Sequence, residues 1–261
     1  MCGRFVSSHT PDKIAEFFGA SFEQEAAALP PNFNVAPTQD VYAVVADAQG
    51  ARELQPFHWG LVPSWAKDTK IGSKMINARA ETITDKPAFK GLFRKHRLLI
   101  PMDGFYEWQQ PGEGAPVGKS GKPIKTPMFI HRTDGKPLAV AGLWAAWRDP
   151  NAPESAGDAA WLHSCTVITT SANDMMSRVH DRMPVILGED EWAAWLDPAN
   201  HDVAALRGML VPAGEDVLVM HPVSTAVNNV RNKGPELIAQ VDVTVAQARN
   251  GEASTLPGLG L

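Results

Sequence analysis

Residues 138–147 read LAVAGLWAAW, and residues 161–170 read WLHSCTVITT. Both are runs of apolar and β-branched residues with the length of a buried strand. The segment between them, residues 149–158, is rich in Asp, Pro, Ala and Gly, the composition of a loop. The sequence therefore predicts two strands joined by a long hairpin loop.

Shorter strand-like runs surround this hairpin, and helical segments are fewer. The further predicted strands are residues 41–46, 53–59, 97–100, 104–109, 127–132, 184–187 and 217–221. The predicted helices are residues 11–18, 86–95, 189–196 and 202–210. Since strands and helices follow no regular βαβ alternation, we expect an α+β domain around a mostly antiparallel, barrel-like sheet with flanking helices.

One domain accounts for most of the chain, over residues 1–241. Residues 242–261 have no strong pattern, and we expect this C-terminal tail to be poorly ordered. A stretch rich in Gly, Pro and Lys, residues 111–125, predicts a long hairpin loop between two strands.

Composition limits the class of protein. The chain has 261 residues, of which 44% are hydrophobic, and its net charge is −5. It contains no apolar run of the roughly 18 residues that a membrane span needs, no secretory signal and only two cysteines, so we expect a cytoplasmic protein. The negative charge means that any DNA-binding function must gather basic residues on one face.

The first residues, Met1-Cys2-Gly3-Arg4, hold the most reactive candidate group. If Met1 is removed, Cys2 carries an α-amine and a thiol on adjacent carbons, a pair that no internal cysteine offers. The amine has a pKa of about 7.7–8.0, so part of it is neutral and nucleophilic near pH 7. It can capture an aldehyde as a Schiff base, and the thiol can then close a thiazolidine ring. A chance cysteine at position 2 explains the residue equally well.

Two motifs hold candidate proton carriers. Glu107 stands between aromatic residues in Gly104-Phe105-Tyr106-Glu107-Trp108, and desolvation there would suit its carboxyl to acid–base work. His180 lies in His180-Asp181-Arg182-Met183-Pro184, just before a predicted strand. The alternatives are a strand whose Glu107 faces water and a surface turn that carries His180.

Other polar and aromatic residues predict contacts with a polymeric anion. In an extended backbone Asn77, Arg79 and Glu81 share one face, and Arg79 suits a phosphate. Pro37 and Trp65 stand in loop-like segments and offer rigid apolar surfaces for unstacked bases. Basic residues at 86, 90, 94, 95 and 97, and at 119, 122 and 125, form either a phosphate track or a solvated surface.

Metal and cofactor sites are not predicted. His163 and Cys165 stand two apart, but no second pair has the spacing of zinc ligands, and no Walker or dinucleotide glycine motif occurs. Cys165 lies in an apolar run and is expected to be a buried, inert thiol.

Together, and in their order, these motifs resemble the SOS response-associated peptidase (SRAP) family. The motifs are Met1-Cys2-Gly3-Arg4-Phe5, Asn34-Val35-Ala36-Pro37, Trp59-Gly60-Leu61-Val62-Pro63, Asn77-Ala78-Arg79-Ala80-Glu81-Thr82, Gly104-Phe105-Tyr106-Glu107-Trp108, His180-Asp181-Arg182-Met183-Pro184 and His221-Pro222-Val223-Ser224. The resemblance covers roughly residues 1–241.

The resemblance implies a function in DNA damage. It implies a monomer that crosslinks covalently to abasic sites in single-stranded DNA, including sites at junctions with duplex DNA, through a thiazolidine at the N-terminal cysteine. Its catalytic positions match Cys2, Asn77, Glu107 and His180. Its DNA contacts match Arg4, Pro37, Trp65, Arg79 and Thr169.

Other activities remain open at this point. One alternative is a hydrolase with an N-terminal cysteine nucleophile, similar to a class II glutamine amidotransferase, which would leave Glu107 and His180 without roles. A second is autoproteolysis that removes Met1, with a lyase-like release of DNA as a related activity. A third is a binding module that forms no covalent bond.

Overall fold

The computed structural model describes residues 2–23, 28–112, 117, 121 and 123–242. The predicted hairpin is confirmed: β10 (Leu138–Arg148) and β11 (Trp161–Ser171) are antiparallel, in register from Gly142 opposite Val167 to Arg148 opposite Trp161. These are the longest strands in the described part of the chain, as expected for uninterrupted β-branched and apolar runs.

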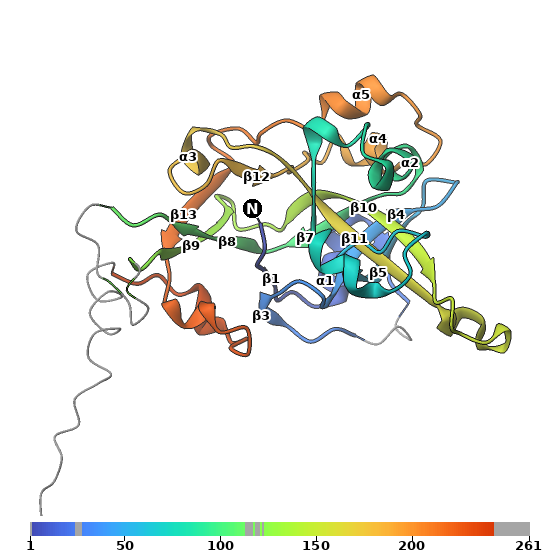
Figure 1. Cartoon of the computed structure of the whole chain (residues 1–261). Coiled ribbons are helices and arrows are strands. Elements are labelled where there is room, and N and C mark those ends of the chain that lie inside the picture. The colour runs from blue at the N-terminus through green and yellow to red at the C-terminus, as the bar shows by residue number, and fades with distance from the viewer. Residues whose placement is uncertain (1, 24–27, 113–116, 118–120, 122, 243–261) are drawn as a thin grey trace, which may run out of the picture.

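Five strands form a closed barrel (Figure 1). The ring runs β5 (Arg52–Trp59), β4 (Asp40–Ala46), β7 (Arg97–Met102), β10 and β11. It closes where β11 pairs with β5 in parallel, with Ser164 opposite His58. The other four pairings are antiparallel, so the predicted α+β class with a barrel-like, mostly antiparallel sheet is confirmed.

Short strands extend the barrel, and a second sheet lies beside it. β2 (Ala20–Ser21) pairs with β5, whereas β6 (Asn77–Arg79) and β12 (Arg182–Pro184) pair with β11. The second sheet has the order β13 (Leu218–Pro222), β9 (Thr126–Arg132), β8 (Gly104–Gln109), β1 (Phe5–Ser7) and β3 (Asn32–Val35). The N-terminal strand therefore lies inside this sheet, between β8 and β3.

The predicted helices are present, and three begin later than predicted. The α-helices are α1 (Pro11–Phe18), α2 (Pro87–Lys95), α3 (Asp174–Ser177), α4 (Trp192–Leu196) and α5 (Val203–Gly208). The short 3-10 helices are η1 (Thr69–Lys74), η2 (Ala80–Thr82), η3 (Glu154–Ala160), η4 (Thr225–Asn228) and η5 (Pro235–Ile238). Helix α5 starts after Asp202 because this carboxylate accepts hydrogen bonds from the amides of Ala204 and Ala205.

Other predicted boundaries also change. The strand predicted at 184–187 is instead β12, since beyond Pro184 only Ile186 forms an isolated bridge, to Val140. The loop predicted at 149–158 includes the start of η3. Most of the 111–125 loop and the tail beyond residue 242 lie outside the described residues.

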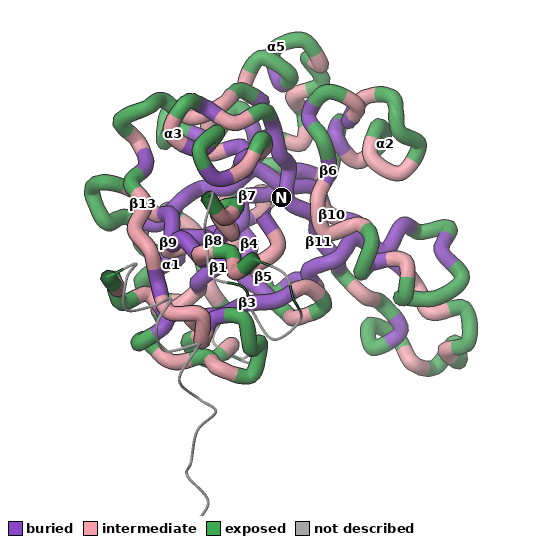
Figure 2. Tube along the Cα trace, turned by 60° about the vertical axis from the view of Figure 1, so that its left-hand side comes forward, coloured by how far each residue is buried: buried purple, intermediate pink, exposed green. Residues whose placement is uncertain are grey.

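Two apolar clusters occupy the two faces of the barrel wall. One lies on the inner side and includes Val140, Cys165 and Val167, and it continues to Cys2 and Phe5. The other lies outside and packs α1, α2, α4 and α5 against the wall. Figure 2 shows that the buried positions run along the strands, whereas exposed positions gather on the connecting loops and outer helices.

A buried arginine joins the helices to the barrel. Arg97, in β7, is almost fully buried. Its Nε donates to the carbonyl of Trp195 at 2.6 Å and its Nη1 to that of Phe93 at 2.8 Å. Its Nη2 donates to the carbonyls of Asp197 and Asn200. Phe93 and Trp195 lie in the last turns of α2 and α4, and Asp197 and Asn200 follow α4; carbonyls at helix ends lack partners within the helix.

We expect Arg97→Ala to be strongly destabilising, because it leaves several buried carbonyls without a donor. Each such carbonyl costs about 1–3 kcal/mol, so the total loss in unfolding free energy is expected to be about 3–5 kcal/mol. The midpoint of urea denaturation measures it. Arg94→Ala, an exposed arginine of α2, is the control and should change the free energy by less than about 0.5 kcal/mol. Equal midpoints for the two variants would contradict this role.

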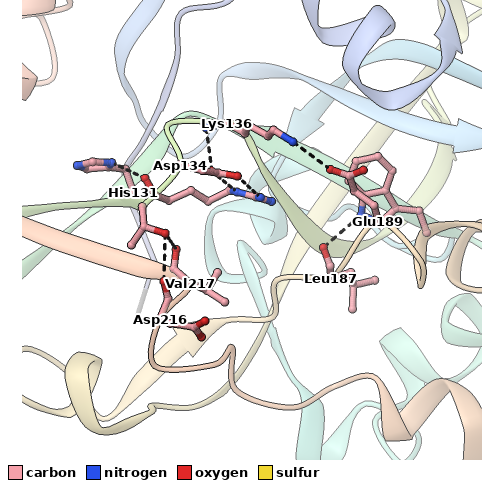
Figure 3. A network of polar contacts seen from close by, with 10 residues as sticks. His131, Asp134, Lys136, Leu187, Glu189, Asp216 and Val217 are labelled. Carbon is pink, nitrogen blue, oxygen red and sulfur yellow. Dashed lines mark hydrogen bonds and ion pairs between the residues drawn. The ribbon is translucent and has the colours of Figure 1, made fainter.

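A polar network fixes the turn between β9 and β10 (Figure 3). The Asp134 carboxylate accepts from Arg132 Nε at 2.8 Å and Nη2 at 2.6 Å, and from the amide of Lys136 at 3.1 Å. The bond to Arg132 lowers the pKa of Asp134 to about 2. Lys136 lies 3.8 Å from Glu189, so the turn also contacts the segment before α4.

Candidate functional site

The N-terminal segment is held by strand pairing. Phe5 pairs with Phe105 of β8, and the amide of Tyr106 donates to the carbonyl of Arg4 at 2.9 Å. Cys2 is only 1% exposed and packs in the inner apolar cluster. Chain ends usually fray unless they are tied down. The backbone from Cys2 onward is tied down in this way, and the same register continued backwards brings Cys2 and Gly3 level with Trp108 and Glu107.

Asn77 anchors the backbone of Cys2. It lies in β6, opposite Val167 of β11. Its Nδ2 donates to the carbonyl oxygen of Cys2 at 3.0 Å. Its Oδ1 is buried and has no hydrogen-bond partner within the described part of the chain. A buried acceptor without a donor is costly, so this oxygen is available to an N–H group at the terminus.

Glu107 lies buried next to the Cys2 thiol. It is 5% exposed, in β8. Burial raises the pKa of the Cys2 thiol well above its usual range, and the nearby Glu107 carboxylate raises it further. The alternative in which Glu107 faces water is therefore wrong. Strand β8 is covered on both faces, because the inner cluster contacts Phe105 and a separate cluster contacts Tyr106.

His180 stands between α3 and β12, with 29% of its side chain exposed. The amide of Arg182 donates to its Nδ1 at 3.0 Å, while the Asp181 carboxylate lies 2.8 Å from the same nitrogen. Both cannot be satisfied, since one requires an unprotonated Nδ1 and the other a protonated one. We favour the backbone donor, because Asp181 is largely exposed and free to rotate. Nδ1 is then the acceptor, and Nε2 carries the proton.

The structure brings the four predicted catalytic residues to one region. Val179 and Met183, on either side of His180, belong to the same apolar cluster as Cys2. Asn77 bonds to Cys2, and Glu107 acts on its thiol. These groups come from four separate parts of the chain, and the barrel and second sheet meet around them.

Arg182 holds together the segments around His180, and sequence reasoning did not identify this contact. Its Nη1 and Nη2 contact the Glu81 carboxylate at 2.5 and 3.0 Å, and its Nη2 donates to the carbonyl of Thr169 at 2.6 Å. The hydrogen bonds from the Arg182 guanidinium lower the pKa of Glu81. They also connect β12, which follows His180, to η2 and to β11. In the sequence, the signal that could have identified Arg182 was its position in the motif that contains His180.

The two predicted phosphate contacts differ. Arg79 is exposed at the end of β6. Arg4 is half-buried: its Nη1 donates to Asn34 Oδ1 at 2.7 Å and to the carbonyl of Val227 at 2.9 Å, and its guanidinium lies 5.7 Å from the centre of the Trp108 ring. Burial lowers the pKa of Arg4. Arg79 is thus free for an anion, whereas Arg4 also supports the second sheet.

Pro37 and Trp65 lie in loops, where Pro37 is partly buried and Trp65 is exposed. Pro37 belongs to a turn closed by a hydrogen bond from the amide of Gln39 to the carbonyl of Ala36, and Thr38 within it has a φ of +70°. A β-branched residue with positive φ is uncommon and tends to occur at functional sites. The side chain of Trp65 is 61% exposed. Both residues therefore remain available as apolar surfaces.

Thr169 does not support a direct DNA contact. Its side chain is fully buried, and its hydroxyl faces the carbonyl of Ala78 and Arg182 Nη2 at 3.5 and 3.3 Å. The neighbouring Thr170 is also buried. We correct this prediction: Thr169 receives Arg182 and helps to position the segment around His180.

The described residues contain no group of three or more His, Cys, Asp or Glu side chains placed to hold a metal ion. Within the same residues no helix is both long enough and apolar enough to cross a bilayer.

Several known proteins are similar to this chain in sequence. Abasic site processing protein YoqW of Bacillus subtilis is 40% identical over 238 residues, which cover 91% of this chain and 99% of that protein. Abasic site processing protein YedK of Escherichia coli is 30% identical, covering 92% and 100%. Abasic site processing protein HMCES of Gallus gallus is 33% identical, covering 80% and 64%.

Solved structures have the same fold. A protein of Bacteroides thetaiotaomicron superposes with a TM-score of 0.77 over 92% of this chain and 100% of that chain, at 23% identity. A phage-related protein of Bordetella bronchiseptica superposes with a TM-score of 0.60 over 85% and 94%, at 30% identity.

The family comparison covers most of the chain. The sequence profile described as SOS response associated peptidase (SRAP) matches residues 1–230, which include every residue of the site described above. The resemblance to this family, recognised in the sequence, is thereby confirmed. The chain belongs to the SOS response associated peptidase family.

Proposed function

We propose that this chain processes abasic sites in DNA by covalent capture through Cys2, after loss of Met1. In this proposal the product is a thiazolidine between Cys2 and C1′ of the ring-opened sugar, on single-stranded DNA or at its junction with duplex. The names of relatives that are 30–40% identical over most of the chain support an abasic-site substrate. The protein acts as a monomer in this proposal.

The observation that carries the proposal is the anchored N-terminus. Cys2 is buried and bonded through its carbonyl to Asn77 Nδ2, although it is the second residue of the chain. The Oδ1 of the same amide lacks a partner among the described residues, and it can accept from the α-amine that removal of Met1 creates. A site that fixes both the position and the direction of an amine suits attack by that amine.

The chemistry proceeds in two bond-forming steps. The neutral α-amine attacks C1′ of the aldehyde, and loss of water leaves an imine. The thiol then adds across the C=N bond, so that sulfur binds C1′ and the thiol proton passes to nitrogen. Overall, aldehyde, amine and thiol give thiazolidine and one water. Burial raises the pKa of the Cys2 thiol, which disfavours its thiolate, and this supports the order in which the amine attacks first.

Two side chains are placed to assist these steps. His180, with the proton on Nε2, can donate a hydrogen bond to the sugar oxygen as the ring opens, which stabilises the negative charge that develops there. Glu107, buried beside the thiol, can take its proton during ring closure and return it to nitrogen. Capture removes the electrophilic aldehyde, which protects the strand from β-elimination.

The direct test is incubation with a single-stranded oligonucleotide that contains one abasic site, followed by a denaturing gel. A shifted band that resists denaturant and requires the aldehyde supports covalent capture. Binding without such a band would reduce the protein to a non-covalent module and overturn the proposal. Hydrolysis of glutamine in place of crosslinking would favour the amidotransferase-like alternative.

Removal of Met1 by the protein itself is a second candidate activity, which the family description as a peptidase favours. Intact-mass measurement of wild type and of Glu107→Gln tests it. If the buried carboxylate assists cleavage, the variant retains Met1, whereas an external aminopeptidase would process both chains equally. A lyase-like release of DNA would appear on the same gels as a slow loss of crosslink.

We expect Glu107→Gln and His180→Ala to slow crosslinking without weakening DNA binding. Glu107→Gln removes a proton carrier and His180→Ala removes a hydrogen-bond donor to the developing charge, and each such group typically contributes about 10²–10⁴-fold to a rate. Single-turnover kinetics on gels measure the rate, and fluorescence anisotropy with an unreactive DNA measures affinity. The control is His201→Ala, an exposed histidine before α5. Wild-type rates for both site variants would leave these residues with structural roles alone.

We expect Arg79→Ala and Arg4→Ala to differ in their effects. Loss of one phosphate contact reduces the slope of log affinity against log salt by about 0.7 on single strands. Arg79→Ala should show this change at unaltered thermal stability, because its side chain is exposed. Arg4→Ala should in addition lower the melting temperature, since it removes two hydrogen bonds. The control is Lys13→Ala on α1; a slope equal to wild type for Arg79→Ala would oppose a phosphate contact.

A further inference from the structure

The loop that carries His180 has little regular structure of its own. It connects β11, which ends at Ser171, to β12, which begins at Arg182, and its one helix, α3, has four residues. A helix of a single turn has no stability of its own in water, because its nucleus fixes several residues for very few hydrogen bonds. The position of His180 therefore depends on the contacts between this loop and the rest of the fold.

The end of α3 is connected directly to His180. The amides of Val179 and His180 both donate to the carbonyl of Met176, each at 2.9 Å. The side chain of Met176 is fully buried in the inner apolar cluster. The amide of Ala172 donates to the carbonyl of Asp181 at 3.0 Å, which closes the base of the loop. Any displacement of α3 is therefore passed on to His180.

The start of α3 is held by a carboxylate from a distant segment. Glu215 lies in the connection between α5 and β13, 41 positions after Asp174. Its Oε1 accepts from the amide of Asp174 at 2.8 Å, and its Oε2 accepts from the amide of Met175 at 3.1 Å. Amides in the first turn of a helix lack partners within the helix, and a negative charge is favourable there. Glu215 thus supplies both acceptors and charge to this turn.

Asn173 connects the same turn to the same segment. Its Oδ1 accepts from the amide of Met176 at 2.9 Å, and its Nδ2 donates to the carbonyl of Ala213 at 3.1 Å. The first turn of α3 and residues 213–215 therefore hold each other through two side chains, one from each segment.

The segment that carries Glu215 is itself fixed to the second sheet. Thr133, in the turn between β9 and β10, donates through its hydroxyl to the carbonyl of Asp216 and through its amide to that of Val217, each at 3.1 Å. Figure 3 shows Asp216 and Val217 beside this turn. The amide of Val217 also donates to the carbonyl of Gly214 at 3.2 Å. Glu215 therefore holds α3 from a rigid support.

We infer that Glu215 is a positioning residue for His180. It holds the first turn of α3 in the place from which the His180 imidazole reaches the sugar at Cys2. The Glu215 side chain is exposed and touches none of the reacting groups, so it acts through α3 alone. This inference rests on the proposed function, in which His180 assists the opening of the sugar ring.

The test compares crosslinking rates at saturating DNA. Glu215→Ala removes both acceptors, and the loss of a helix cap typically shifts an equilibrium by about 2- to 30-fold. We expect crosslinking to slow by this factor. The Kd for an unreactive oligonucleotide, with tetrahydrofuran in place of the abasic sugar, should stay unchanged. Glu215→Gln keeps one acceptor oxygen and should recover part of the rate.

Two exposed carboxylates provide matched controls. Asp202→Ala removes the same kind of cap from α5, where the carboxylate accepts from the amides of Ala204 and Ala205 at 3.0 Å each. Asp216→Ala removes the same charge from the same segment and leaves the carbonyl that Thr133 contacts. Both variants should crosslink at the wild-type rate.

Two further measurements separate positioning from general stability. In a His180→Ala background, Glu215→Ala should slow crosslinking no further, because the group that it positions is absent. The ring-proton NMR resonance of His180, identified by its absence in His180→Ala, should move in Glu215→Ala and stay in place in both controls. If Glu215→Ala melts below the assay temperature, Glu215→Gln serves for the same comparisons.

Three results would overturn the inference. One is a wild-type rate together with an unmoved His180 resonance in Glu215→Ala. The others are equal slowing in the His180→Ala background and equal slowing by Asp202→Ala, since each would assign the effect to general stability. If the wild-type protein forms no crosslink at all, the proposed function fails separately. The His180 resonance then decides the inference: a shift confined to Glu215→Ala supports it, and no shift overturns it.

Discussion

Cys2→Ala and Cys2→Ser are expected to form no stable crosslink with abasic DNA and to give only an imine. Both variants lack the sulfur that closes the ring. Both keep the α-amine, so sodium borohydride should trap the imine as a permanent adduct in either variant. The hydroxyl of serine is a far weaker nucleophile than the thiol, so without borohydride its product should disappear on the denaturing gel.

The second cysteine provides a matched control for this experiment. Cys165 is a fully buried thiol in the same apolar cluster, and burial also raises its pKa. Cys165→Ala should therefore crosslink at the wild-type rate, although a buried side chain is shortened. An undiminished adduct in Cys2→Ala, or its loss in Cys165→Ala alone, would rule out a thiazolidine at Cys2.

Blocking the N-terminus is expected to abolish crosslinking, although every internal side chain stays intact. A retained Met1, an added tag or an acetyl group converts the α-amine of Cys2 to an amide, which cannot form an imine. The thiol alone would give only a labile hemithioacetal. The residual adduct on a denaturing gel should therefore fall below detection.

Three preparations of one protein make this test decisive. They are a free Cys2 terminus, a tagged terminus, and the tagged protein after a protease has exposed Cys2. We expect crosslinking in the first and third only. A tag after residue 261 controls for the added size of a tag. It should leave crosslinking unchanged, since the family match ends at residue 230. Equal crosslinking by the tagged protein would move the chemistry to an internal residue.

Sequence patterns predicted the long strands well and the short ones poorly. The runs that became β4, β5, β10 and β11 have enough apolar or β-branched residues to define their own secondary structure. Strands β1, β3 and β6 have three or four residues each, too few for a pattern. They form because neighbouring strands offer free edges. The parallel closure between β11 and β5 is likewise a tertiary pairing that no local signal carries.

The candidate site shows the same division. The motif order indicated Cys2, Asn77, Glu107 and His180, but alternation along residues 104–109 left the direction of Glu107 undecided. Its burial follows from clusters on both faces of β8, which only the assembled sheets provide. The same limit explains why the sequence did not predict the buried contacts of Arg97 and Arg182. Charged residues are expected at the surface, and only the fold shows the carbonyls and the carboxylate that accept hydrogen bonds from them.

The fixed N-terminus has a consequence for the timing of activity. Cys2 is among the first residues to leave the ribosome, yet its anchor, Asn77, is 75 positions downstream, and Glu107 and His180 follow later still. Contacts so distant in sequence form only when most of the domain has been synthesised. A nascent chain therefore exposes an ordinary cysteine, and the proposed aldehyde trap would exist only in the finished protein.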